Sequence, residues 1–70
     1  MIKFENPENG RYYYLVKEKD ILNELVLTVI RGGRNVRVVR RMGFGCESLI
    51  QKEIERISKK RIKRGYILVT

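Results

Sequence analysis

The spacing of apolar residues changes once along this chain of 70 residues, and the change restricts the possible folds more than any other feature. Up to Met42, apolar and polar residues alternate in short runs, which is the period of half-buried strands. From residue 47 to residue 64 the period becomes helical, and Ile50, Ile54 and Ile57 share one face. This order predicts an α+β fold, in which a small antiparallel sheet of four to five strands packs against one helix near the C-terminus.

Turn-forming residues divide the first part of the chain into four expected strands, at residues 1–5, 11–19, 25–31 and 35–42. Between the last two strands, Gly32, Gly33 and Arg34 indicate a tight turn, because glycine reaches positive φ without steric cost. Alternation then puts Arg37 and Arg41 on one face of the fourth strand.

Val39 falls on the same face as these two arginines, whereas Val38 shares the other face with Arg40. Both faces therefore mix valine with arginine. A bulge at Val38 and Val39 would resolve this conflict.

Several large apolar residues outside the helix are expected to be buried. We assign Phe4 and Phe44 to the core, and we expect Ile21 and Leu22 to pack back on the sheet from the polar connection at 20–24.

The helix is expected to begin at Ser48, whose spacing to Gln51 fits a capping box, or at Cys46 or Gly45. Gly65 is well placed to end it in a left-handed conformation. Residues 66–70 then form a final short strand.

A chain of this length forms one domain, 1–70, with a small core, so we expect no large enclosed active site and no small-molecule substrate. It carries 16 basic and 8 acidic side chains, a net charge of +8, and no histidine. The charge is uneven: residues 1–30 have 4 basic and 5 acidic side chains, and the remainder has 12 basic and 3 acidic ones. This balance favours a polyanionic partner, with an anionic membrane surface as the rival.

Five of these cations lie in the segment VIRGGRNVRVVRRMGFG, residues 29–45, which has no acidic residue: Arg31, Arg34, Arg37, Arg40 and Arg41. One guanidinium group can donate two parallel hydrogen bonds to two phosphate oxygens, so phosphate binding is one interpretation of these arginines. The other is a solvated strand surface that protects a sheet edge from aggregation.

A second basic run, RISKKRIKR at 56–64, favours the phosphate reading, because it holds more cations than the helix dipole explains. We therefore predict nucleic-acid binding with weak sequence preference, through eight residues drawn from both elements: Arg31, Arg34, Arg37, Arg41, Lys59, Lys60, Lys63 and Arg64. Whether the two elements form one surface is left open by the sequence. The tyrosines at 12, 13, 14 and 66 could stack on bases, although packing is the more common role for each.

Catalysis finds no support in the sequence. Cys46 has no histidine to act as its base, and Glu47, Glu53 and Glu55 diverge around the predicted helix. We therefore expect no enzyme, no catalytic residue, no cofactor and no bound metal.

Cys46 is also the only cysteine, which excludes an internal disulfide and favours a reducing, cytoplasmic setting. The segment MIKFENPENG has neither a basic region followed by an apolar run nor a cleavage pattern, so we expect no secretory signal and no membrane insertion.

The sequence resembles the WGR domain family in four features: GRYYYL at 10–15, LVLTVIRGGRNV at 25–36, Phe44 ahead of the helix, and KKRIKRGY at 59–66. The resemblance covers nearly the full chain and implies an antiparallel sheet with one helix. The signature Trp-Gly-Arg corresponds either to Arg31-Gly32-Gly33 or to Gly32-Gly33-Arg34, and in the second register Gly32 replaces the tryptophan. In poly(ADP-ribose) polymerases this signature meets the end of a DNA break, so the resemblance favours DNA over RNA and gives that role to Arg34.

Two other readings are kept. The chain is alternatively a protein-interaction module that binds an acidic partner, or that forms a homodimer through an edge strand at 66–70. Adsorption to anionic lipid is a weaker reading, because the basic face of the helix lacks bulky apolar residues.

Overall fold

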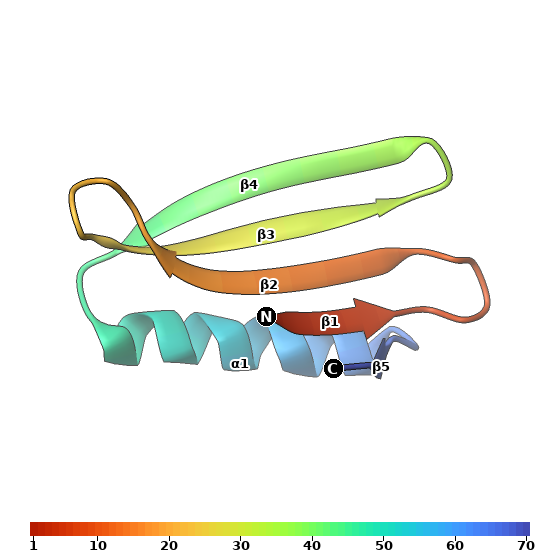
Figure 1. The fold of residues 1–70 in the computed structure, drawn as a ribbon. Helices are drawn as coiled ribbons and strands as arrows, with labels where there is room; N and C mark the ends of the chain where they lie inside the picture. The colour runs from red at the N-terminus through yellow and green to blue at the C-terminus, as the bar shows by residue number, and fades with distance from the viewer.

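In the computed structural model, which describes all 70 residues, the chain forms one sheet and one helix (Figure 1). The strands are β1 (Ile2–Glu5), β2 (Tyr12–Lys19), β3 (Leu25–Gly33), β4 (Val36–Phe44) and β5 (Ile67–Leu68). The helix α1 (Glu47–Lys63) lies between β4 and β5 in the chain. The five strands pair antiparallel in the order β4-β3-β2-β1-β5, which confirms the predicted α+β fold.

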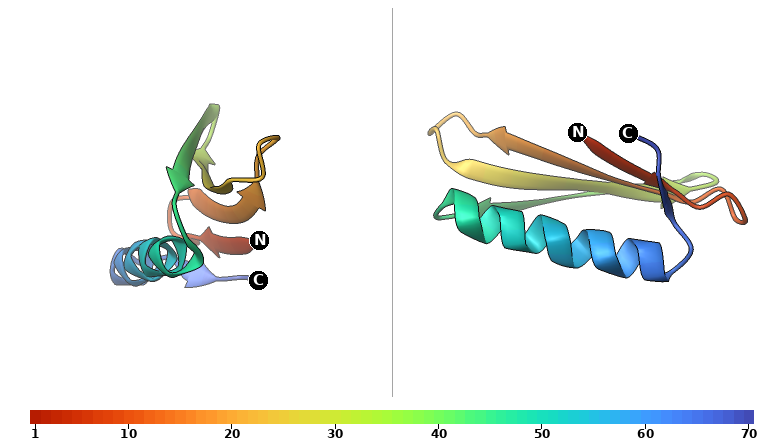
Figure 2. Two further views of the ribbon diagram at one scale, coloured as in Figure 1. Left: turned by 90° about the vertical axis from the view of Figure 1, so that its left-hand side faces the viewer. Right: turned by 90° about the horizontal axis from the view of Figure 1, so that it is seen from below.

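The core lies between α1 and one face of the sheet, along which the helix runs (Figure 2). The apolar stripe of the helix is buried as predicted, and it packs with alternate residues of β1, β2 and β3. The seven members of this core are Phe4, Leu15, Leu27, Val29, Ile50, Ile54 and Ile57. Phe44 is partly buried against them, so both phenylalanines contribute to the core. Burying four or more large aliphatic side chains at about 1.5–3 kcal/mol each is the main stabilising term for a chain this short.

The turn between β3 and β4 differs from the prediction. Gly32 and Gly33 belong to β3, and the turn residues are Arg34 and Asn35, of which Asn35 has a φ of 58°. Asparagine tolerates this left-handed region better than most residues, so the turn does not need a glycine. The glycine at position 32 is required for space instead, because a Cβ there would lie 2.2 Å from a backbone oxygen of β4.

The register of β3 with β4 is continuous, from Leu25 opposite Phe44 to Gly33 opposite Val36. No bulge interrupts it, so alternation alone decides which side chains of β4 face the helix side of the sheet. Val38 and Arg40 lie on that side. Arg37, Val39 and Arg41 lie on the other, in agreement with the predicted faces.

The connection between β2 and β3 also differs from the prediction, because Ile21 and Leu22 do not pack on the sheet. Ile21 is fully exposed, and Leu22 is three-quarters exposed. The loop is closed by polar groups instead: the Asp20 carboxylate accepts hydrogen bonds of 2.9 Å from the backbone N–H groups of Leu22 and Glu24, and Asn23 has a φ of 64°. These local bonds order the backbone and leave both apolar side chains outside.

Helix α1 begins after Cys46, one of the predicted boundaries, and the predicted glycine follows its C-cap, Arg64. Gly65 has a φ of 88°, and its N–H group bonds the Ile62 carbonyl at 3.1 Å, while the Tyr66 N–H group bonds the Arg61 carbonyl at 3.0 Å. This is the Schellman arrangement. The chain then turns into β5, which pairs with β1 as the predicted final strand.

Candidate nucleic-acid interface

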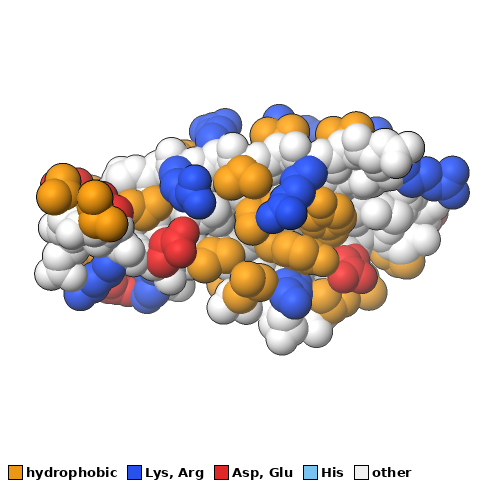
Figure 3. Space-filling model, turned by 45° about the horizontal axis from the view of Figure 1, so that its top comes forward, with side chains coloured by type: hydrophobic (Ala, Val, Ile, Leu, Met, Phe, Trp, Pro, Cys, Tyr) orange, Lys and Arg blue, Asp and Glu red, His pale blue; other side chains and the backbone are white.

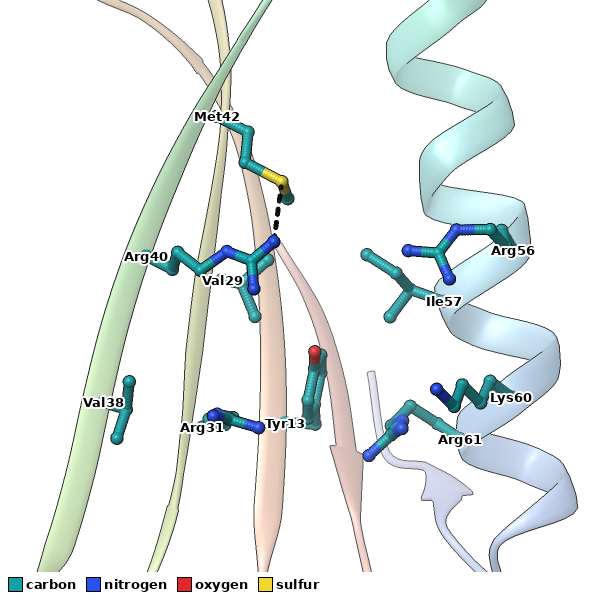
Figure 4. Close-up of a pocket in the computed structure, with 10 residues that line it drawn as sticks. All are labelled: Tyr13, Val29, Arg31, Val38, Arg40, Met42, Arg56, Ile57, Lys60 and Arg61. Atoms are coloured by element: carbon teal, nitrogen blue, oxygen red, sulfur yellow. Dashed lines mark hydrogen bonds between the residues drawn. The ribbon is translucent and has the colours of Figure 1, made fainter.

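Strand β4 is exposed at most positions, and a groove lies between it and α1 on the helix side of the sheet (Figure 4). The groove has a volume of about 210 Å³. Its apolar lining consists of Tyr13, Val29, Val38, Met42 and Ile57. Its cations are Arg31, Arg40, Arg56, Lys60 and Arg61. Toward the end of α1 it continues into a second cavity, which shares Arg31, Lys60 and Arg61 and adds Arg11 and Arg64. We call this continuous surface the basic groove.

Strand register and helix period together bring these side chains to one place. Tyr13 of β2 is opposite Arg31 of β3, which is opposite Val38 of β4, so the three lie in one row on the helix side. On α1, Arg61 follows the buried Ile57 by one turn and therefore points back toward the same row. The cations thus approach the groove from the sheet on one side and from the helix on the other, as Figure 4 shows.

No aspartate or glutamate lines either cavity. Of the groove cations, Arg56 forms an ion pair with Glu53, and the only other ion pair of the chain joins Lys17 to Glu47 at the far end of the helix. Arg40 directs one guanidinium nitrogen to the Met42 sulfur, at 3.6 Å. Apart from Arg56, the cations of the basic groove have no ion-pair partner, so the groove is a concave surface of positive charge that concentrates anions from solution.

Arg61 is the most constrained of these cations. Its guanidinium carbon lies 4.5 Å from the centre of the Tyr13 ring and 5.3 Å from that of Tyr66, and the two rings are in edge-to-face contact. Its Nε atom is buried and has no hydrogen-bond partner. The π faces attract the cation, but no anion of the chain compensates its loss of hydration.

The structure divides the eight predicted residues among separate surfaces. Arg31, Lys60 and Arg64 line the basic groove, and Arg34 lies at the tip of the β3–β4 hairpin. Arg37 and Arg41 lie on the opposite face of the sheet. The remaining two, Lys59 and Lys63, flank the exposed Ile62 on the helix.

Four cations of the groove were missing from the prediction: Arg11, Arg40, Arg56 and Arg61. The predicted set does not include Arg40, because alternation puts it on the other face of the strand from Arg37 and Arg41. This same alternation points it into the groove. Arg61 could have been found from its spacing of four residues to Ile57 in the apolar stripe.

The tyrosines divide in the same way between the two faces of the sheet. Tyr13 and Tyr66 pack against the core, which is the role expected for each tyrosine. Tyr12 and Tyr14 lie on the other face, with ring centres 4.8 Å apart and ring planes inclined by 32°.

The remaining candidate chemistry is limited. No group of three or more histidine, cysteine, aspartate or glutamate side chains is arranged to hold a metal ion. Cys46 is exposed, and a hydrogen bond of 3.3 Å with the Ser48 hydroxyl lowers the pKa of its thiol. No helix of the chain combines the length and the apolar character needed to cross a bilayer.

Comparisons of this chain with models of known families, with curated proteins and with solved structures found no match. The resemblance to the WGR family stays a prediction based on the residues that carry it.

Proposed function

We propose that this protein is a non-catalytic nucleic-acid-binding module that contacts phosphate groups through the basic groove. The observation that carries the proposal is Arg61, a guanidinium packed over two tyrosine rings, with a buried, unpartnered Nε and no carboxylate paired with it. A cation in this position is stabilised when an anion enters the groove.

The neighbours of Arg61 make phosphate the best-matched anion. Arg31 and Arg40 add guanidinium forks, whose geometry fits phosphate oxygens, and Lys60 adds a point charge. The first cavity, at about 210 Å³, is smaller than the cavities of about 300–1,000 Å³ that enclose drug-sized ligands, and the second, at about 480 Å³, extends the basic groove toward the end of α1. A polymer of phosphates uses all of these cations at once.

Weak sequence preference is part of the proposal. The apolar face of α1 packs on the sheet, so the helix is not free to enter a major groove and read base edges. Contacts to phosphates position a nucleic acid but do not specify its sequence. The WGR resemblance favours DNA over RNA and adds Arg34, at the hairpin tip, to the residues that contact the nucleic acid. We also propose that the protein acts in the cytoplasm.

The test is the salt dependence of binding, followed by fluorescence anisotropy of a labelled oligonucleotide. If about six phosphates are engaged, log K should fall against log salt with a slope of about −5. A slope near zero, or no binding at low salt, contradicts phosphate contact through the groove.

A second candidate is supported by the opposite end of the sheet. β5 is an edge strand, and Ile67, Leu68 and Val69 are 53%, 60% and 44% exposed there. An edge strand with exposed apolar side chains can pair with another chain, so self-association or a protein partnership at β5 is the alternative function. Sedimentation equilibrium tests self-association. An interface with a Kd below about 100 μM would produce dimers at that protein concentration, so a monomer there contradicts self-association.

A further inference from the structure

The sheet has a second functional candidate on the face that α1 does not cover, here called the open face. Alternation places on it the apolar or aromatic side chains of Tyr12, Tyr14, Val16, Ile30 and Val39. Figure 3 shows hydrophobic side chains gathered over the middle of this face, with basic and some acidic side chains among and around them. Contiguous apolar surface of this kind on a small domain marks a binding site more often than chance.

The paired rings of Tyr12 and Tyr14 are the centre of the open face. Both are partly exposed, and neither belongs to the core. Tyr12 lies against Gly32, where a Cβ atom would come within 2.7 Å of its hydroxyl oxygen. Tyr14 donates a long hydrogen bond of 3.5 Å to Glu5, and the Lys3 ammonium group lies 5.4 Å from its ring centre. The two rings are therefore held by their contact with each other, by the glycine and by Lys3 and Glu5, and both stay partly exposed to solvent.

Arg37 and Arg41 extend from β4 onto the same face. Arg37 lies in the cross-strand row of Tyr12 and Gly32, and Arg41 lies two rows away. Neither forms an ion pair. The face also holds two acidic side chains: Glu5, opposite Tyr12, accepts the hydrogen bond from Tyr14, and Glu18 accepts one from Thr28, which lies opposite Arg41.

From this arrangement we infer that the open face stacks the unpaired bases of a single-stranded nucleic acid on Tyr12 and Tyr14, with Arg37 and Arg41 at its phosphates. The inference rests on the proposed function and names its substrate class. An aromatic ring stacks on any base, whereas the bases of a duplex are covered by one another and present only their edges. Because β4 is an edge strand, the same nucleic-acid chain can pass over its free edge into the basic groove.

Charge argues against a second copy of this protein as the occupant. Each chain carries a net charge of +8, so a symmetric contact would bring two strongly positive molecules together. Like charges across an interface are unfavourable, so a polyanion complements this face and a second copy does not.

The decisive probe is a labelled oligothymidine of about 12 nucleotides, compared with an abasic oligomer that has the same sugar-phosphate backbone. The inference predicts that the oligomer with bases binds about tenfold more tightly than the abasic one. Equal affinity for the two overturns the inference and leaves the proposed function standing. Absence of binding to both contradicts the proposed function itself.

Two variants locate the effect on the open face. Tyr12→Leu with Tyr14→Leu keeps apolar cover but removes both rings, and it should reduce the affinity for oligothymidine to that of the abasic oligomer. Tyr12→Phe with Tyr14→Phe keeps the rings and should bind within about twofold of the unchanged protein. Circular dichroism shows whether the leucine variant is folded. If it is unfolded, the inference is tested by comparing oligothymidine with the abasic oligomer on the unchanged protein. Full affinity in a folded leucine variant, or equal binding of a duplex, overturns the inference.

The chemistry of unpaired bases on a phosphate backbone is shared by single-stranded DNA and RNA. An oligouridine of the same length separates the two sources. Equal binding of both oligomers assigns the face to bases in general, and a preference for one of them shows that the sugar is also read. Both results agree with the inference, which fails only if neither oligomer binds better than the abasic backbone.

Discussion

The guanidinium carbon of Arg61 lies 4.5 Å from the centre of the Tyr13 ring, and no carboxylate of the chain pairs with it. A cation that is partly removed from water without an anion adds little to the stability of the fold, because the attraction of the ring offsets only part of its lost hydration. Binding of an anionic ligand therefore explains the position of Arg61 better than a contribution to the stability of the fold does.

Replacing Arg61 with methionine should therefore separate binding from stability. The Arg61→Met side chain fills similar space against the two rings without a charge, so the free energy of unfolding should change by less than about 1 kcal/mol. Affinity for an oligonucleotide should fall about tenfold, because one charge-assisted contact is lost. Urea unfolding and anisotropy measure the two quantities. A large loss of stability with unchanged affinity would make Arg61 a structural residue.

Gly32 and Gly43 form a matched pair for testing the β3–β4 hairpin. A Cβ atom at Gly32 would lie 2.2 Å from the Val36 carbonyl oxygen and 2.7 Å from the Tyr12 hydroxyl oxygen, whereas one at Gly43 meets nothing within 4 Å. Gly32→Ala should lower the free energy of unfolding by about 1–3 kcal/mol. Gly43→Ala should be neutral or stabilise by about 0.4–1 kcal/mol, because alanine restricts the unfolded chain.

The urea midpoints of the two alanine variants provide the measurement. The unchanged protein is the reference for both. Equal midpoints for the two variants would contradict the close approach at Gly32.

Cys46 should react with thiol reagents at lower pH than an ordinary cysteine. The hydrogen bond of the Ser48 hydroxyl to its sulfur favours the thiolate and lowers the pKa of the thiol, so the reactive form is populated further toward neutral pH. The rate of alkylation by iodoacetamide, measured against pH, gives the midpoint. Ser48→Ala should move this midpoint to higher pH, and an identical profile in both proteins would show that the hydroxyl has no part in it.

Two features of the fold could be predicted from spacing alone. The isoleucines at 50, 54 and 57 recur at the helical period, and all three are buried against the sheet. Period-two alternation correctly placed Arg37 and Arg41 on one face of β4 and Arg40 on the other, because the strand has no bulge. Both patterns reflect burial on one side of an element, which a sequence records directly.

The turn and the groove depend on geometry that spacing does not contain. The glycine pair at 32 and 33 predicted a turn, but a close approach to Tyr12 requires the first glycine, and Asn35 makes the turn. Likewise, the basic run at 56–64 does not tell which of its cations meet the sheet. That depends on how far α1 covers the sheet, and because β4 is left exposed, Arg61 and Lys60 meet Arg31 across the groove.

The most direct test of the central claim compares double variants that each remove two positive charges. Arg31→Ala with Lys60→Ala takes both from the basic groove, and Lys17→Ala with Lys19→Ala takes both from the far end of β2. A third protein, Lys59→Ala with Lys63→Ala, takes them from the part of α1 beside Ile62.

Each protein is titrated by anisotropy with the same labelled oligonucleotide over a range of salt concentrations, after urea unfolding has confirmed that it is folded. Removal of the two groove charges should lower affinity at least about tenfold and reduce the salt slope by about 2, while the β2 variant should change affinity less than about threefold. The Lys59 and Lys63 variant should resemble the β2 variant. Equal losses in all three proteins would contradict the claim, because they would show that only the net charge attracts nucleic acid and that the groove holds no phosphate.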